Sequence, residues 1–382
     1  MKIGVPKETA VGEHRVALVP DSVPPLVKAG VEVLIESGAG SAAYFADAEY
    51  EKAGARVVPD AAALWREADV VLKVQKPTGK EINMLREGVA LVGFLQPLTD
   101  SELVRQLARR KITAFAMEAV PRISRAQRMD ALSSQANIAG YKAVLIAASS
   151  LPKLFPMMMT AAGTILPAKV LVLGAGVAGL QALATARRLG AQVWGYDVRP
   201  VVKEQVQSLG AKFLEFDLGL KDIEDKGGYA RELSPEAKRK QQELLAEKTK
   251  EFDVVITTAL IPGKPAPRLI TKETVAGMHP GSVIVDLAAE AGGNCELTEA
   301  DKVVVKDGVT IHGPTNLPGT MPRHASRLYA RNVTELLKEF VKEGKLQLDL
   351  SDEIIKAACV THQGEIVNEA VKAALSAGTK TA

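Results

Sequence analysis

Short apolar runs alternate with amphipathic stretches along the first 120 residues. The apolar runs have the length and the β-branched content of buried strands, and the segments between them repeat apolar positions at helical spacing. Such alternation is typical of a parallel sheet with helices on its faces. We therefore predict strands in KIGVP, VEVLIES, VVLKVQ, VALVGFL and ITAFAM, and helices in DSVPPLVKAG and DSELVRQLARRK.

The second half of the chain repeats this pattern. Helical segments there separate the predicted strands VLVLGAG, QVWGYD, AKFLEF, DVVITTA, SVIVDLA, VVVKDGV and VTIHG. A long helix over 131–150 leads into this part, and another over 323–342 leads back. The sequence predicts an α/β protein of two Rossmann-like, doubly wound parallel-sheet domains with a cleft between them. The first domain comprises residues 1–132 and 323–382, and the second comprises 133–322.

The segment 170–179, VLVLGAGVAG, places a G-x-G-x-x-G motif between a strand run and a helical pattern. Gly174 permits a tight turn, Gly176 lets backbone N–H groups approach a pyrophosphate, and Gly179 lets the helix pack closely on the strand. Asp197 ends the next apolar run, about 20 residues on, where an acid that accepts ribose hydroxyls is expected. The pattern predicts a dinucleotide site, and this carboxylate favours NAD over NADP. A glycine-rich turn without a ligand is the alternative.

Residues 217–252 interrupt the α/β rhythm with a dense run of charges. Ser234-Pro235-Glu236 has the form of a helix start. Before it, Gly227 and Gly228 form a hinge next to one aromatic side chain, Tyr229. Two interpretations stay open, a solvated surface loop and a lid that closes Tyr229 over a bound nucleotide and orders when it binds.

The connector between the predicted domains, residues 121–135, is rich in polar side chains. Arg122, Gln127, Asp130 and Ser133 offer the donors and acceptors that a nicotinamide carboxamide needs, and an Arg122–Asp130 pair would make a rigid polar edge. The alternative is a solvated loop with a helix cap, and the residues alone favour it.

Cations lie near two predicted strand ends, at Lys7, Arg15 and Lys73. The carboxyl ends of parallel strands face the ligand crevice, so these side chains either bind a substrate carboxylate or pair with acids of the chain. The segments 257–267 and 286–296 also follow strands, and we expect them beside the cofactor, with Glu290 towards the nicotinamide end.

The composition argues against several other classes of protein. The net charge of +3 and the aromatic content of 4% are too low to indicate nucleic-acid binding. Cys295 and Cys359 form no C-x-x-C pair, which favours reduced thiols in a cytosolic chain. The scattered histidines predict no metal site. The N-terminus lacks the apolar core of a signal peptide, and the apolar stretch 154–170 is too short and interrupted to span a membrane.

The sequence resembles the family of alanine dehydrogenases and of NAD(H)-binding components of nicotinamide nucleotide transhydrogenase, over nearly the whole chain. The segments that carry the resemblance are KETAVGEHRVALVP, VLKVQKP, GAGVAG, ITTALIPGKPAP and VDLAAEAGGNCE. Three more resemble the transhydrogenase specifically: PRISRAQRMDALSSQANIAGYKAV, FPMMMTAAGT and GGYA. Two positions depart from alanine dehydrogenase, because Gln96 stands where that enzyme has a catalytic His and Glu290 where it has an Asp. Gln cannot exchange a proton at neutral pH.

The resemblance implies a homodimer that binds NAD(H). A partner component would hold NADP(H), a membrane component would conduct protons, and the chain would sit peripherally at the cytoplasmic membrane face. It also implies that the polar connector, with Arg122, Gln127, Asp130 and Ser133 as candidate catalytic and ring-positioning residues, orients the nicotinamide, and that Tyr229 belongs to a closing loop. The remaining candidate cofactor contacts are Gly174, Ala175, Gly176, Val177, Gly179, Asp197, Val198, Gly228, Thr258, Ala259 and Leu260. A soluble alanine dehydrogenase-like enzyme is the alternative.

Overall fold

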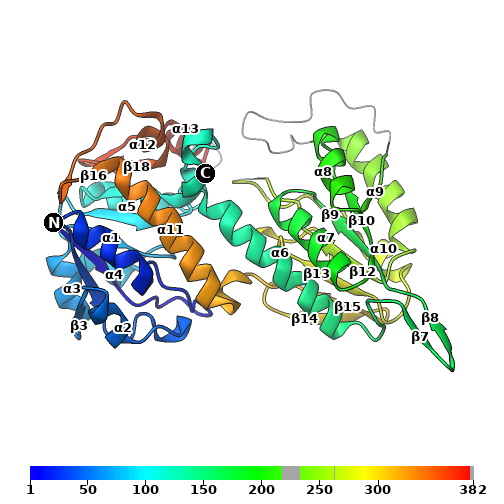
Figure 1. The fold of residues 1–382 in the computed structure, drawn as a ribbon. Helices are drawn as coiled ribbons and strands as arrows, with labels where there is room; N and C mark the ends of the chain where they lie inside the picture. The colour runs from blue at the N-terminus through cyan, green and yellow to red at the C-terminus, as the bar shows by residue number, and fades with distance from the viewer. Residues whose placement is uncertain (217–232, 262, 379–382) are drawn as a thin grey trace. The chain divides into compact units, whose positions relative to one another are not determined.

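The computed structural model describes residues 1–216, 233–261 and 263–378, and the chain divides into two compact units (Figure 1). Unit 1 is Met1–Gln135 with Pro318–Ala382, and unit 2 is Ala136–Leu317. The helix α6, Ala131–Ser150, begins in unit 1 and continues into unit 2. Its predicted span is confirmed, and Gly140 within it permits close packing in unit 2, because a Cβ there would lie 2.1 Å from the Ala178 carbonyl oxygen.

Unit 1 is built on an eight-stranded sheet in the order β19-β18-β6-β5-β4-β1-β2-β3. The strands from β6 to β3 are parallel and follow the doubly wound order 3-2-1-4-5-6, and β18 and β19 are antiparallel additions. The sheet strands are β1 Lys2–Val5, β2 Glu32–Glu36, β3 Arg56–Val58, β4 Val70–Leu72, β5 Ala90–Gly93, β6 Thr113–Ala116, β18 Cys359–His362 and β19 Glu365–Ile366, and a separate hairpin pairs β16 Val341–Lys342 with β17 Lys345–Leu346.

The helices of unit 1 cover its sheet and bury two apolar clusters against it. They are α1 Val23–Lys28, α2 Asp47–Lys52, α3 Ala61–Glu67, α4 Gly79–Met84, α5 Ser101–Arg109, α11 Pro322–Phe340, α12 Glu353–Ala358 and α13 Glu369–Gly378. Local caps set several starts: the Asp100 carboxylate accepts the Leu103 N–H at the start of α5, and Thr78 forms a capping box with Glu81 at α4. Figure 1 shows α11, late in the chain, beside the amino-terminal elements of this unit.

Unit 2 contains a seven-stranded sheet in the order β11-β10-β9-β12-β13-β15-β14. All pairs are parallel except β14 with β15, so the order is again that of a doubly wound sheet. Its strands are β9 Lys169–Leu173, β10 Gln192–Tyr196, β11 Lys212–Phe213, β12 Val254–Thr257, β13 Val283–Asp286, β14 Val303–Lys306 and β15 Val309–His312, and its helices besides α6 are α7 Val177–Arg188, α8 Lys203–Ser208, α9 Pro235–Thr249 and α10 Lys272–Ala276. The predicted fold class, two Rossmann-like parallel-sheet units, is confirmed.

Several sequence-based element predictions need correction. The predicted strand VVLKVQ ends at Leu72, and the side chain of the next residue, Lys73, forms a buried ion pair with Glu81. The helix predicted over 323–342 ends at Phe340, where β16 begins. Two hairpins escaped prediction, the pair β18–β19 and the pair β7 Met158–Thr160 with β8 Gly163–Ile165. In the described part of the chain no helix is long and apolar enough to cross a membrane.

Candidate functional site

The turn from β9 to α7 needs glycine at two of the fingerprint positions. Gly174 has a φ of +97°, and a Cβ there would lie 2.6 Å from the Thr258 hydroxyl oxygen. At Gly179 a Cβ would lie 1.8 Å from the Gly174 carbonyl oxygen. Gly174 therefore lets the loop after β12 approach the turn, and Gly179 lets α7 approach the end of β9, more closely than a side chain permits.

Gly176 is the residue that caps the amino terminus of α7, and its surroundings are open. Within the described ranges, a Cβ at Gly176 would meet no heavy atom within 4 Å. No side chain caps the helix at this residue. The first N–H groups of a helix lack intrahelical partners and carry positive partial charge, so this geometry fits a phosphate group. Ala175 is buried beside it and Val177 is half-buried.

Asp197 is joined to the glycine loop and also to a cation that follows it. Its Oδ2 accepts the Ala175 N–H at 2.8 Å, which places the carboxylate next to the turn. The Arg199 side chain donates Nε to Oδ1 at 3.0 Å and Nη2 to Oδ2 at 2.9 Å. The side chains of Asp197 and Arg199 are 6% and 14% exposed. Arg199 therefore points inward and balances the charge of the acid locally, the condition under which the sequence predicts that it offsets Asp197.

The loop after β12 packs against the fingerprint. The Thr258 hydroxyl donates to the Gly174 carbonyl oxygen at 2.9 Å. Asn294, fully buried, accepts the Ala259 N–H at 3.0 Å and donates to the Ala259 carbonyl oxygen at 2.9 Å. Leu260 is 46% exposed. The structure thus brings Thr258 and Ala259 to the fingerprint, and Asn294 supports their loop. The sequence indicates Asn294 only as a member of the segment 286–296, which is expected beside the cofactor.

Two candidate cofactor contacts, Gly228 and Tyr229, lie outside the described residues, as does most of the predicted lid. The helix start predicted after them is confirmed, because Ser234 caps α9 and its hydroxyl accepts the Ala237 N–H at 3.2 Å. Val198, between Asp197 and Arg199, is half-buried.

The polar connector forms a short 3-10 helix, η4 Ser124–Met129, followed by the start of α6. Arg122 and Gln127 are exposed, and Asp130 and Ser133 are half-buried. Asp130 accepts the Ser133 N–H at 2.8 Å and the Ser133 hydroxyl at 2.6 Å, so it acts as the amino-terminal cap of α6. The helix-cap interpretation is therefore correct for Asp130, and Arg122 and Gln127 present polar groups at the surface.

Two of the strand-end cations of unit 1, Arg15 and Lys73, pair with acids of the chain. Lys73, 1% exposed, lies 2.9 Å from a Glu81 oxygen and 3.3 Å from a Glu8 oxygen. Arg15 forms a buried pair with Glu13 at 2.6 Å. Burial opposes ionisation of Glu13, but the hydrogen bonds and charge of Arg15 lower its pKa to about 2. Of the two interpretations left open by the sequence, internal pairing describes Arg15 and Lys73.

A buried carboxyl, Glu118, lies beside the backbone of Gln96. Its Oε1 accepts the Gln96 N–H at 2.5 Å, and among the described residues its shielded Oε2 has no hydrogen-bond partner. Burial raises the pKa of Glu118 to about 7, although backbone N–H groups oppose the rise. Gln96 itself holds a φ of +52°. This site therefore contains a carboxyl that loses its proton only as the pH approaches neutrality.

Glu118→Gln is expected to remove a pH dependence of stability. Between about pH 4.5 and pH 7 the unfolded chain loses the Glu118 proton while the folded chain keeps it. The wild-type free energy of unfolding should therefore fall by roughly 3 kcal/mol across that window from this group. The variant, which is neutral throughout, should lack that part of the fall. Urea unfolding at pH 5, 6, 7 and 8 measures the free energy of unfolding of the wild type and of the variant. The same dependence on pH in both proteins would contradict the expectation.

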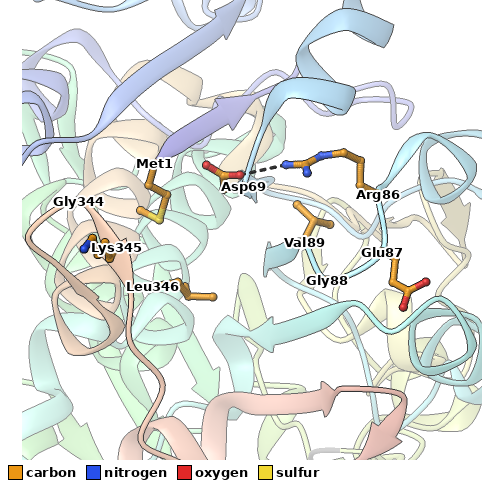
Figure 2. Close-up of a pocket in the computed structure, with 9 residues that line it drawn as sticks. All are labelled: Met1, Asp69, Arg86, Glu87, Gly88, Val89, Gly344, Lys345 and Leu346. Carbon is orange, nitrogen blue, oxygen red and sulfur yellow. Dashed lines mark hydrogen bonds and ion pairs between the residues drawn. The ribbon is translucent and has the colours of Figure 1, made fainter.

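A surface pocket of about 420 Å³ lies at the amino-terminal ends of strands in the unit 1 sheet (Figure 2). Met1, Asp69 and Val89, which line it, directly precede β1, β4 and β5. Arg86 pairs with Asp69 across it at 3.0 Å. Doubly wound sheets bind ligands at the carboxyl ends of their strands, so the fingerprint edge of unit 2 is the better candidate site.

Comparison with known proteins assigns both halves of the chain to one family. Residues 4–139 match the model described as "Alanine dehydrogenase/PNT, N-terminal domain", and residues 143–369 match "Alanine dehydrogenase/PNT, C-terminal domain". The chain is 52% identical over 379 residues to a Rhodospirillum rubrum protein, the first of the parts into which that organism's NAD(P) transhydrogenase subunit alpha is divided. The match covers 97% of this chain and 99% of that protein.

Solved structures agree with the sequence comparison. The crystal structure of transhydrogenase from Sinorhizobium meliloti superposes with a TM-score of 0.85 at 46% identity, covering 97% of this chain and all of that one. An L-alanine dehydrogenase gives 0.81 at 30% identity over 99% of both chains. The relatives confirm the transhydrogenase interpretation of the sequence over the dehydrogenase alternative, which is the more distant match. The chain belongs to the alanine dehydrogenase/PNT family.

Proposed function

We propose that this chain binds NAD(H) and exchanges hydride with NADP(H) held by a separate partner component, within a proton-translocating NAD(P) transhydrogenase. The observation that carries the proposal is the open amino terminus of α7 at Gly176, next to an acid, Asp197, bonded to the same loop. The identity to transhydrogenase alpha subunits over nearly the whole chain supports it. Hydride transfer in a mixture with the NADP-binding component tests it.

The residues of unit 2 fit a dinucleotide. The N–H groups at the start of α7 would hold the diphosphate, with Gly174, Ala175, Gly176, Val177 and Gly179 forming the turn beneath it. The Asp197 carboxylate would accept ribose hydroxyls, beside Val198. The loop with Thr258, Ala259 and Leu260 would border the cofactor. The bound nicotinamide supplies the hydride chemistry, so the protein's role is to position it and exclude water.

We assign ring positioning to the polar connector. Arg122 and Gln127 present exposed donors and acceptors, and Asp130 and Ser133 are fixed in one orientation by their mutual hydrogen bonds. A carboxamide needs both kinds of partner to hold one ring face. The connector therefore acts on the rate of hydride transfer more than on nucleotide affinity.

A second copy of the chain is the partner we propose for the hairpin β7–β8, giving a homodimer. The hairpin extends from the rest of unit 2 (Figure 1), and both of its strands are exposed. Met157, Met159 and Leu166 are exposed apolar side chains, and residues 154–168 contain no charge. An isolated two-stranded hairpin is only marginally stable, and an identical uncharged edge would extend it symmetrically. Sedimentation of the purified chain measures this state.

The complex that we propose has two further components. A membrane component would conduct protons, and the chain would be held at the cytoplasmic membrane face through its partners. The support for both is the name of the relatives, which are subunits rather than whole enzymes. We assign no nucleic-acid partner, in keeping with the mild net charge of +3.

Arg199→Ala is expected to widen the preference for NADH over NADPH by about tenfold or more. In the wild type, Arg199 neutralises Asp197 and offers a cation to a 2′-phosphate. Without it, the phosphate would face an unpaired carboxylate, and two such charges ~4 Å apart repel by up to ~4 kcal/mol at an effective dielectric constant of 20. Titration of both nucleotides gives the ratio of dissociation constants.

Arg188→Ala is the matched control for this variant. Arg188 is an exposed arginine of unit 2 at the carboxyl end of α7, away from the helix start. It should leave the ratio of dissociation constants unchanged. A ratio for Arg199→Ala within twofold of wild type would show that Arg199 does not set nucleotide preference.

A further inference from the structure

A continuous chain of polar side chains runs through the interior of unit 1. Arg15 donates Nε and Nη2 to the Glu13 carboxylate at 2.8 and 2.6 Å, and Nη1 to Gln135 Oε1 at 2.9 Å. Gln135 in turn donates to the Ser134 hydroxyl and to the Ala325 carbonyl oxygen, both at 3.2 Å. Glu13, Arg15 and Gln135 are all buried. The pair Glu13–Arg15 is therefore tied to the first turn of α6.

Asn332 of α11 continues this chain to the polar connector. The Ser134 hydroxyl donates to Asn332 Oδ1 at 2.7 Å, and Asn332 Nδ2 donates to the Arg128 carbonyl oxygen at 2.7 Å. The Asn332 side chain is buried, at 7% exposed, and both of its bonds are partly buried. Arg128 lies between Gln127 and Asp130, two of the residues assigned to the nicotinamide. One amide side chain thus bridges η4 and the start of α6.

The polar connector is also held by ion pairs of Arg125, an exposed residue of η4. The Arg125 guanidinium contacts the Asp352 and Glu339 carboxylates at 2.5 and 3.4 Å. Arg125 is 46% exposed, and ion pairs of such exposure stabilise little. The bonds of Asn332 are the stronger restraint, because Asn332 itself is buried and a buried donor or acceptor left without a partner is costly.

We propose that Asn332 is a positioning residue for hydride transfer, holding the connector 122–133 in the orientation that presents its polar side chains to the nicotinamide. The inference rests on the proposed function for its link to catalysis. Arg15 is the far end of the same network, so its cation serves to anchor the connector and not to bind a substrate carboxylate. Small displacements of orienting groups cost large factors in rate, since transfer needs close and aligned reacting atoms.

Asn332→Ala and Asn332→Leu test the proposal, the second keeping the side-chain volume while removing both hydrogen bonds. Backbone amide exchange over 124–130 should become about tenfold faster in each. The rate of hydride transfer with the NADP-binding component should fall by about tenfold or more, and the dissociation constant for NADH should stay within twofold. Arg331→Ala, an exposed neighbour on α11, should change none of these quantities.

The readouts separate the possible failures. Unchanged amide exchange over 124–130 in the folded variants would overturn the anchoring role of Asn332. Faster exchange with an unchanged transfer rate would overturn its role in positioning for catalysis. If the wild-type chain itself transferred no hydride with the partner component, the proposed function would fail, while amide exchange would still decide whether Asn332 holds the connector.

Discussion

Gly179→Ala is expected to weaken NADH binding by roughly 100-fold and to destabilise unit 2. A Cβ at this position would lie 1.8 Å from the Gly174 carbonyl oxygen, 2.9 Å from its carbonyl carbon and 3.3 Å from Val172 Cγ1. Two of these atoms are backbone, so relief requires α7 to move away from β9. Overpacking typically lowers the free energy of unfolding by ~1–3 kcal/mol. Because the added Cβ would clash with backbone atoms, which cannot rotate away, we expect a loss of about 3 kcal/mol.

The shift should also cost affinity, because it displaces the helix start that we assign to the diphosphate. A loss of about 3 kcal/mol in binding corresponds to roughly 100-fold in the dissociation constant. Titration with NADH and thermal unfolding measure the two effects. Wild-type affinity in this variant would contradict the assignment of the site.

Two glycine variants provide controls with different expected results. Gly176→Ala should unfold at the wild-type temperature yet bind NADH weakly, because its Cβ meets no described atom within 4 Å and would fill the space proposed for the phosphates. Gly79→Ala, in unit 1 with equally open surroundings, should change neither quantity. Weak binding with normal stability in Gly176→Ala alone would separate ligand contact from packing.

The fingerprint turn was predictable because its determinants are local. A strand run, three glycines and a helical pattern follow one another within 20 residues, and each has a steric reason that the structure reproduces at Gly174 and Gly179. The acid at Asp197 was found for the same reason. The ion pair of Asp197 with Arg199 is equally local. Whether the Arg199 side chain turns inward depends on its rotamer, however, and residue spacing does not determine a rotamer.

The hairpin β14–β15 has a local sequence signal for its antiparallel pairing. Asp307 and Gly308 join the two strands, and both have positive φ, 50° and 78°. An Asp-Gly pair between apolar runs is a strong hairpin signal, so the antiparallel pairing was available from sequence. Both strands were predicted, but their direction was not.

The hydrogen-bond network of Asn332 could not be predicted from the sequence, because it joins residues that are far apart along the chain. Its bond to Ser134 joins residues 198 positions apart, and its bond to Arg128 joins residues 204 apart. Such contacts depend on α11 returning to unit 1 in one register. An Asn within an amphipathic helix looks like a surface residue until that register is known. The same holds for Arg15, which the sequence left as either a ligand or a paired cation.

The isolated chain is expected to bind NADH and yet to oxidise no amino acid, and hydride transfer should appear only when an NADP-binding component is added. Acid–base catalysis contributes typically 10²- to 10⁴-fold, and Gln96 supplies none at neutral pH. The two cations suited to a substrate carboxylate, Arg15 and Lys73, are buried in pairs with Glu13, Glu8 and Glu81. Activity with alanine and NAD should therefore stay below that of a dehydrogenase by at least ~10²-fold.

Gln96→His tests whether the missing base is the sole obstacle. We expect no alanine oxidation from this variant, because Arg15 and Lys73 remain engaged with internal carboxylates and no substrate carboxylate is held. Spectrophotometric assays with alanine and NAD, and with NADH and NADP plus the purified partner, measure both reactions on one preparation. Ordinary dehydrogenase turnover by the wild-type chain would overturn the transhydrogenase proposal. Turnover by Gln96→His alone would instead show that the buried ion pairs open to admit a carboxylate, and that a single side chain separates the two chemistries of this family.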